Sequence, residues 1–151
     1  MPPPVIRPAR ADEYDEVGRV WMESWASTGL AEASDFLLAN LRARIRREIE
    51  NGWSLFVADD NGTVAAMLAL HLPRLYLDML FVAPDYQGRS LGRRLLAFAR
   101  TQMPDEMSLR CVRENEKAWR WYEREGFLFE KEELEPSNGF MMKYYRWKRA
   151  A

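Results

Sequence analysis

Residues 75–100 have the sequence LYLDMLFVAPDYQGRSLGRRLLAFAR, which predicts a buried strand, a tight turn and a helix in succession. Residues 75–82 form a short apolar run with β-branched and aromatic side chains, and Ala83-Pro84 ends it. From Ser90 the apolar side chains recur at helical spacing, at Leu91, Leu95, Leu96 and Phe98. The rest of the chain is organised around this strand–turn–helix unit.

The turn that precedes this helix is the best candidate for a phosphate-binding site. The first N–H groups of a helix have no partner within it, and the positive end of the helix dipole lies there. Three basic side chains, Arg89, Arg93 and Arg94, add positive charge to the same turn. We therefore expect a phosphorylated ligand to bind at this point.

Residues 87–92, Gln-Gly-Arg-Ser-Leu-Gly, resemble the acyl-CoA loop of the GNAT N-acetyltransferases, whose pattern is Gln/Arg-x-x-Gly-x-Gly/Ala. Val82 and Pro84, at the end of the preceding strand, are also typical of that family. Ser90 stands where the family usually has glycine. Because serine suits a helix N-cap but adds a side chain close to the phosphates, we expect CoA binding to be retained with a local adjustment.

Residues 115–127, NEKAWRWYEREGF, resemble a second GNAT motif, Asn-x-x-Ala-x-x-x-Tyr-x-x-x-Gly-Phe, at every fixed position. Two motifs in the right order are far more specific than either alone. The expected order of elements, β-α-α-β-β-β-α-β-α-β-β, is also that of the GNAT fold and covers essentially the whole chain. We therefore predict one N-acetyltransferase domain over residues 1–151, of α/β class, with a mixed, mostly antiparallel central sheet flanked by helices.

Local signals outside the two motifs place the remaining elements. Residues 5–8 suggest a short edge strand that the proline ends. Asp12 is the expected N-cap of a first helix, and Asp35 that of a second helix that runs to about Glu50. Asn61-Gly62 favours positive φ and predicts a hairpin between two strands.

Composition limits the class of protein. The chain has 151 residues, of which 48% are hydrophobic, and a net charge of −1, which does not favour nucleic acid as a partner. No apolar segment reaches the ~20 residues that span a bilayer, and the N-terminal sequence lacks the apolar core of a signal peptide. The single cysteine, Cys111, forms no internal disulfide and provides no zinc cluster. We expect a cytoplasmic protein with neither a membrane partner nor a metal.

The resemblance implies that acetyl-CoA is the co-substrate. In this family the strand before the loop splays from its neighbour, and its backbone pairs with the pantetheine arm as another strand would. A backbone N–H there polarises the thioester carbonyl. The residues expected to bind the co-substrate are Leu80, Phe81, Val82, Gln87, Gly88, Arg89, Ser90, Leu91, Gly92, Arg93 and Asn115.

Tyr122 takes the role of general acid by the same resemblance. Acyl transfer from a thioester expels a thiolate whose conjugate acid has a pKa of about 8.5, and a positioned phenol can protonate it as it leaves. The alternative is that Tyr122 is an ordinary core aromatic beside Trp119 and Trp121, since aromatic residues at helical spacing usually pack.

Asp78 is the candidate general base, because an amine with a pKa of about 10 must lose a proton before it attacks. It lies in an otherwise apolar strand, where alternation puts Tyr76, Asp78 and Leu80 on one face. The alternative is a structural aspartate paired with an arginine. Glu23 is the second candidate base, whereas His71 ends a strand and is expected at the surface.

The sequence therefore predicts an N-acetyltransferase that acts on the primary amine of a small molecule, by direct attack in a ternary complex. Trp25 and Tyr76 are candidates for lining the acceptor site. One alternative is acetylation of a protein N-terminus or lysine, although Arg110 stands where the ribosomal-protein alanine acetyltransferase type carries a catalytic glutamate. Another is a non-catalytic acyl-CoA sensor, against which Tyr122 and Asn115 argue. Many family members are dimers, so a homodimer stays open.

Overall fold

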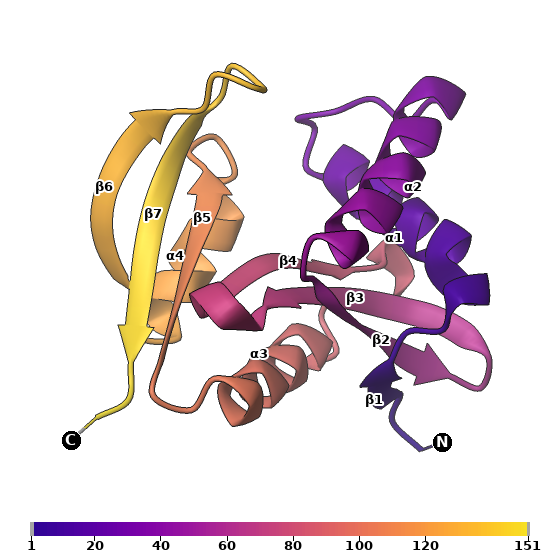
Figure 1. The fold of residues 1–151 in the computed structure, drawn as a ribbon, viewed down its shortest axis with the longest axis horizontal. Coiled ribbons are helices and arrows are strands. Elements are labelled where there is room, and N and C mark those ends of the chain that lie inside the picture. Colours follow the sequence, from indigo (N-terminus) through magenta and orange to yellow (C-terminus); the bar gives the residue numbers. More distant parts are fainter. Residues whose placement is uncertain (1, 151) are drawn as a thin grey trace.

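The computed structural model describes residues 2–150, whose strands form one sheet (Figure 1). The strands are β1 (Val5–Pro8), β2 (Ser54–Asp60), β3 (Thr63–His71), β4 (Tyr76–Val82), β5 (Glu106–Val112), β6 (Leu128–Leu134) and β7 (Met141–Lys148). The α-helices are α1 (Tyr14–Ser27), α2 (Asp35–Glu50), α3 (Leu91–Gln102) and α4 (Glu116–Arg124). Short 3₁₀ helices occupy Ala11–Glu13, Leu72–Arg74 and Pro84–Tyr86.

The sheet is mixed and mostly antiparallel, as predicted. Its seven strands, counted within residues 2–150, follow the order β1-β2-β3-β4-β5-β7-β6. Every neighbouring pair is antiparallel except β4 and β5, which are parallel. The predicted hairpin joins β2 to β3, and both Asn61 and Gly62 have positive φ there. The predicted α/β class is therefore confirmed.

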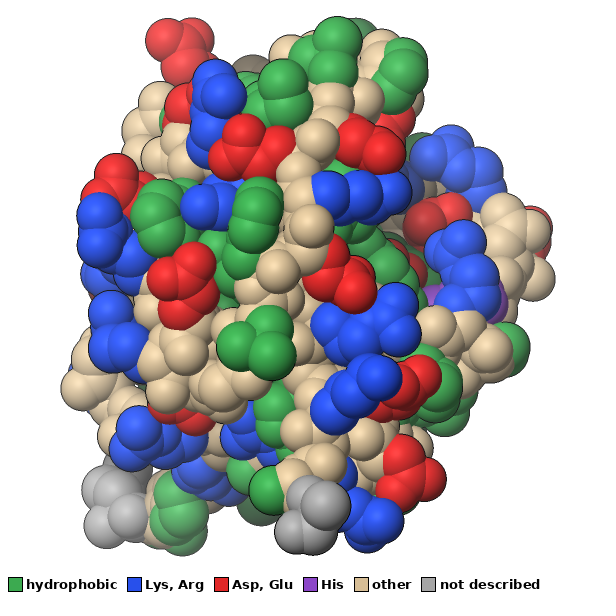
Figure 2. All heavy atoms as spheres, turned by 90° about the vertical axis from the view of Figure 1, so that its left-hand side faces the viewer, with side chains coloured by type: hydrophobic (Ala, Val, Ile, Leu, Met, Phe, Trp, Pro, Cys, Tyr) green, Lys and Arg blue, Asp and Glu red, His purple; other side chains and the backbone are tan. Residues whose placement is uncertain are grey.

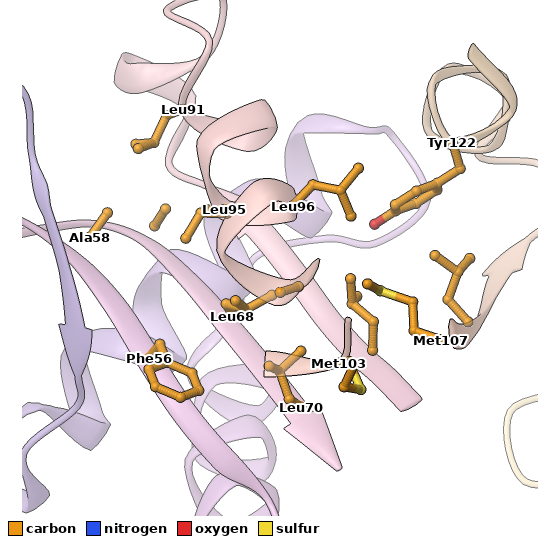
Figure 3. Packing of buried hydrophobic residues seen from close by; sticks show 14 of the residues in the cluster. Phe56, Ala58, Leu68, Leu70, Leu91, Leu95, Leu96, Met103, Met107 and Tyr122 are labelled. Atoms are coloured by element: carbon orange, nitrogen blue, oxygen red, sulfur yellow. The ribbon is translucent and has the colours of Figure 1, made fainter. Parts of the chain in front are cut away.

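Helices cover both faces of the sheet (Figure 1). On one face α1 and α2 bury Val17, Trp21 and Ile45 against β2 and β3. On the other face, α3 packs its apolar stripe over the same strands (Figure 3), through Leu91, Leu95, Leu96 and Ala99. Because β3 is covered on both faces, residues 64–70 are all buried, and their sequence is a continuous apolar run rather than an alternating one.

Two predicted helix caps are wrong by one or two residues. Asp12 lies inside the short 3₁₀ helix, and it is the Glu13 carboxylate that accepts the backbone N–H of Arg10, at 2.8 Å. The second helix is capped by Ser34, whose hydroxyl oxygen accepts a backbone N–H three residues later at 3.0 Å, so Asp35 is the first helical residue. Several neighbouring polar residues compete for each cap, and the backbone geometry selects one.

The face that β6 and β7 present to solvent carries acidic and basic side chains mixed with hydrophobic ones (Figure 2). All seven residues of β6 are exposed. Ion pairs join Arg146 to Glu130 at 3.1 Å and Lys131 to Glu133 at 2.9 Å. The acidic side chains of β6 therefore lie on a solvated strand face. Among residues 2–150 no helix is both long and apolar enough to cross a membrane.

Candidate active site

The sheet opens between β4 and β5. These strands pair only at Tyr76 and Ser108, close to the start of β4, where the backbone N–H of Ser108 also donates to the carbonyl of Leu75 at 2.9 Å. Beyond that point the two strands diverge, and the edge of β4 that faces β5 has no strand beside it. This opening is the splay that the resemblance predicts, and it leaves backbone groups free to bind an extended ligand.

A β-bulge in β4 changes which side chains share a face. Leu77 pairs with Leu70 and Met79 pairs with Ala69, so Asp78 is the extra residue. Leu77 and Leu80 both pack on the α3 side, whereas Met79 packs on the α1 side. The prediction that Leu80 shares a face with Asp78 is therefore wrong, because strict alternation fails at a bulge.

A cleft of about 670 Å³ lies at the opening. It is bordered by the end of β4, the turn before α3, the start of α4 and the end of α1. The predicted co-substrate residues that line it are Leu80, Phe81, Val82, Gln87, Gly88, Ser90, Leu91, Gly92, Arg93 and Asn115. Sequence reasoning missed further lining residues, among them Ser24, Glu114, Glu116, Lys117 and Trp121.

The turn before α3 has an unusual backbone. Ser90 occupies the N-cap position with φ 63° and ψ 13°, a left-handed conformation, and its side chain makes no capping hydrogen bond. The predicted N-cap role of the Ser90 hydroxyl is therefore wrong, because an N-cap side chain bonds the helix from an extended backbone. The usual family glycine would adopt this φ without strain. Gln87 stabilises the turn, since its side-chain amide donates to the Val82 carbonyl at 3.0 Å.

The three arginines of the turn do not act together. Arg93 lines the cleft, although its guanidinium also pairs with Glu125 at 3.1 Å. Arg94 turns away and donates to the Pro4 carbonyl at 2.7 Å, and Arg89 stacks over Tyr86 outside the cleft lining. Of the three arginines expected to cluster at the phosphate site, Arg93 is the one that lines the cleft. The other basic side chain of the cleft is that of Lys117, in the first turn of α4.

Tyr122 lies in the core in this structure. Its side chain is 8% exposed and packs against Trp121 and Phe127, with ring centroids 4.9 and 5.5 Å away. It points from α4 towards Leu96 on α3 (Figure 3), and Trp121 is the aromatic residue of α4 that lines the cleft. Burial raises the pKa of the Tyr122 phenol, so it keeps its proton. Its role as general acid stays a prediction.

Asp78 faces the α1 and α2 side of the sheet. Its carboxylate accepts a hydrogen bond from the indole N–H of Trp53 at 2.7 Å, and burial raises its pKa above the ordinary aspartate value. Among residues 2–150 no arginine lies within ion-pairing distance of it, so the alternative of a structural aspartate–arginine pair is not what the structure has. Glu23 is exposed on α1, which contributes Ser24 and Ser27 to the cleft instead.

An aromatic wall connects Asp78 to the cleft. Trp21 of α1 lies between Trp53 and Phe81, with ring centroids 6.1 and 6.2 Å away. Trp53 holds Asp78, and Phe81 lines the cleft. The three aromatic residues Trp21, Trp53 and Phe81 are called the aromatic wall below. The candidate base and the candidate thioester position are therefore connected through packed aromatic side chains, of which Trp21 and Trp53 are buried.

Polar side chains gather beside Asp78. Tyr76 is half-buried, and burial raises its pKa to about 12. Its electrostatic neighbours include Arg110, whose guanidinium pairs with Glu135 at 2.6 Å. Farther out, Trp25 of α1 contacts Phe140, which precedes β7, edge to face at 6.1 Å. Both predicted acceptor residues thus lie on this side of the sheet.

His71 and Cys111 are the single histidine and the single cysteine of the chain, and neither lies at the open surface. His71 is half-buried rather than at the open surface, with its Nε2 3.2 Å from the Asn51 carbonyl and its Nδ1 buried without a partner. It borders a separate cavity of about 280 Å³ that Trp53 also lines. Cys111 is buried, which raises the pKa of its thiol to about 12 and leaves it unreactive.

The chain is similar in sequence to known N-acetyltransferases. The chain is 29% identical over 141 residues to a probable N-acetyltransferase of Mycobacterium tuberculosis, covering 81% of this chain and 78% of the other. It is 31% identical over 127 residues to the peptidyl-lysine N-acetyltransferase YjaB of Escherichia coli, covering 81% and 80% of the two chains.

Known structures share the fold. The PaiA N-acetyltransferase of Thermoplasma acidophilum, solved in complex with coenzyme A, superposes with a TM-score of 0.71 at 20% identity, over 99% of this chain and 100% of the other. A model of the acetyltransferase (GNAT) family matches residues 14–127, which include the splayed strand, the turn and the second motif. The chain therefore belongs to the acetyltransferase (GNAT) family and is an enzyme of the N-acetyltransferase class.

Proposed function

We propose that this enzyme transfers the acetyl group of acetyl-CoA to the primary amine of a small molecule, by direct attack within a ternary complex. The observation that carries the proposal is the cleft at the β4–β5 opening, which joins an unpaired strand edge to a helix N-terminus. These features fit the two ends of the co-substrate, because a strand edge pairs with pantetheine amides and a helix N-terminus attracts phosphate.

The residues of the cleft divide by role. The backbone of residues 87–92, with Arg93 and Lys117, would hold the phosphates. The backbone of residues 80–82 would pair with the pantetheine arm and donate an N–H to the thioester carbonyl. Acetyl-CoA supplies the activated acyl group.

Three proton transfers accompany the reaction. Asp78 takes one proton from the substrate ammonium, the neutral amine nitrogen forms a bond to the carbonyl carbon, and the bond from that carbon to sulfur breaks. The nitrogen releases its second proton to solvent as the amide forms. The leaving thiolate needs a proton, and Tyr122 is the motif residue for that step. Because Tyr122 lies in the core here, that role requires its phenol to turn towards the cleft.

The contact between Trp25 and Phe140 supports a small acceptor. It connects α1 to the β6–β7 turn and so bridges the acceptor side of the opening. A protein substrate would need an open groove there. Lysine acetylation in a protein is the second candidate function, and the similarity to YjaB, a peptidyl-lysine N-acetyltransferase, favours it.

The test is a thiol-release assay with acetyl-CoA against polyamines, aminoglycosides, amino acids and lysine-containing peptides. We expect turnover with one class of small amine, lost in Asp78→Asn and lowered in Tyr122→Phe. Glu23→Gln, which removes an exposed carboxylate on α1, is the matched control and should retain activity. Turnover with peptides alone would favour the second candidate, and CoA binding without any turnover would refute both.

A further inference from the structure

Arg44 is a half-buried guanidinium with no acidic partner. Its neighbours on α2 behave differently, since Arg42 and Arg46 both pair with Asp15, at 3.7 and 2.9 Å. No carboxylate within residues 2–150 lies at ion-pairing distance from Arg44. It stacks over Trp21 instead, 5.3 Å from the ring centroid. Burying a charge is costly unless it is paired, so an arginine in this state is ready to receive an anion.

The aromatic wall places this guanidinium near the candidate base. Arg44 covers Trp21, Trp21 contacts Trp53 at 6.1 Å between centroids, and Trp53 donates its indole N–H to Asp78. Trp21 also contacts Phe81, which lines the co-substrate cleft. Arg44 and Asp78 therefore contact one run of packed aromatic side chains, of which Phe81 lines the cleft.

The other charged groups of this region already have partners or lie elsewhere. Arg110 pairs with Glu135 at 2.6 Å, and Arg74 stacks on Tyr76 with its guanidinium 6.0 Å from the ring centroid. Glu48, one turn after Arg44 on α2, borders the cavity beside Trp53. Burial lowers the pKa of the Arg44 guanidinium, which also interacts electrostatically with Glu48, Arg110 and Asp78. Arg44 and Arg74 are the arginines of this group without an acidic partner among residues 2–150, and Arg44 is the one that contacts the aromatic wall.

We propose that the acceptor carries a carboxylate beside its primary amine, with the amine at Asp78 and the carboxylate bound by Arg44. The substrate class is therefore that of amino acids and related small amino carboxylates. This inference rests on the proposed function and adds the identity of the second charged group. Guanidinium and carboxylate form paired, charge-assisted hydrogen bonds, so one arginine suffices to select the class.

The first test compares matched acceptors that differ in one group. Each amino acid is assayed beside its carboxamide and the amine that lacks the carboxyl group, for example leucine, leucinamide and 3-methylbutylamine. We expect kcat/KM to be about 10- to 100-fold higher for the acid than for the amide, the range for losing a hydrogen-bonded charge pair. Equal rates for acid and amide would overturn the inference while leaving the proposed function intact.

The second test assigns the preference to Arg44. In Arg44→Gln we expect KM for the acid to rise until acid and amide are equal, with kcat nearly unchanged, and Arg44→Lys should restore part of the preference. Arg47→Gln, which removes an exposed arginine from the same helix, is the matched control and should change neither. An acid preference that survives in Arg44→Gln would refute the assignment.

A binding measurement separates this inference from the proposed function. The indole N–H signal of Trp53 is followed by NMR while leucine, leucinamide or acetate is added to the CoA complex. We expect the acids to shift that signal in the wild type and not in Arg44→Gln, whether or not turnover occurs. If acids bind but no amine is acetylated, the proposed function fails and the carboxylate site stands. If no acid shifts the signal, the inference fails.

Discussion

The Asp78 carboxyl is held half-buried by the Trp53 indole, and burial raises its pKa. A carboxyl with a raised pKa binds its proton more tightly in the folded state, so stability is lost as pH rises from the ordinary aspartate range through the raised value. We therefore expect Asp78→Asn to leave the free energy of unfolding at pH 7 equal or higher. As the loss of a general base, it should lower kcat/KM by about 10²- to 10⁴-fold.

Urea unfolding and a pH–rate profile check this prediction together. The acid limb of kcat/KM should lie above the ordinary aspartate pKa of about 3.9 and should vanish in Asp78→Asn. A variant that lost stability and activity in parallel would instead assign Asp78 a structural role.

Ser90 carries strain at the turn that faces the phosphates. A left-handed φ costs an L-residue about 1–2 kcal/mol, and glycine avoids this cost but loses more entropy on folding. We expect Ser90→Gly to raise the free energy of unfolding by about 0.5–1 kcal/mol. Ser90→Ala should be nearly neutral, because the hydroxyl makes no capping bond. Denaturant unfolding measures both changes in the free energy of unfolding. Destabilisation by Ser90→Ala would show instead that the Ser90 hydroxyl caps the helix.

Lys117 is the basic residue of the cleft that sequence reasoning missed. It is exposed, so its attraction to a phosphate is screened by salt, and we expect Lys117→Gln to weaken CoA binding by no more than about fivefold at low salt. The difference should disappear near 1 M salt. Titration calorimetry at several salt concentrations measures it. Lys148→Gln, at the exposed end of β7, should leave the affinity unchanged.

At the scale of elements, the sequence predicted the strand–turn–helix unit, and ten of the eleven residues expected to bind the co-substrate line the cleft, together with further residues that it missed. It did so because the two motifs specify backbone positions, and backbone contacts do not depend on how side chains pair. The sequence-based prediction failed where one extra residue in a strand, or one competing hydrogen-bond partner, decides the direction of a side chain. The bulge at Asp78 moved Leu80 to the opposite face, and the carbonyl of Pro4, distant in sequence, withdrew Arg94 from the turn.

The junction of β1 and α1 depends on one carboxylate. The Glu13 carboxylate accepts hydrogen bonds from the Arg7 guanidinium at 2.6 Å and from the backbone N–H of Arg10 at 2.8 Å. These hydrogen bonds lower the pKa of Glu13 from 4.5 to about 2. A lowered carboxyl pKa contributes stability at neutral pH that is lost as pH falls from 4.5 towards 2. We expect Glu13→Gln to be less stable at pH 7 and to show a flatter decline over that window.

Unfolding free energies measured between pH 2 and pH 7 provide the check for the Glu13 prediction. Glu16→Gln removes a half-exposed carboxylate from the first turn of α1, three residues further along the chain, and serves as the control. A Glu13→Gln curve parallel to that of the wild type would contradict the prediction.

At the scale of the whole molecule, the opening divides the sheet into a part with β1–β4 and a part with β5–β7 (Figure 1). On the α3 side a shared core spans the two parts, through Leu68, Leu96 and Tyr145 among others. On the acceptor side the Trp25–Phe140 contact spans them. The molecule is thus firmly joined on one face and joined by a small aromatic contact on the face where the acceptor would enter.

This asymmetry predicts that Phe140→Ala widens the acceptor side without loosening the co-substrate cleft. Losing an aromatic pair removes about 0.5–1.5 kcal/mol, too little to unfold the domain. We expect KM for small amines to rise, the kcat/KM of lysine-containing peptides relative to small amines to increase, and CoA affinity to stay the same. Trp25→Ala should have the same effects as Phe140→Ala. The double variant should differ little from either single variant, because both substitutions remove the same contact. Phe36→Ala, which trims an exposed ring of α2, is the control. If Phe140→Ala lowered stability yet left the ratio of peptide to small-amine rates unchanged, the contact would be packing alone, and the entrance for the acceptor would lie elsewhere on the molecule.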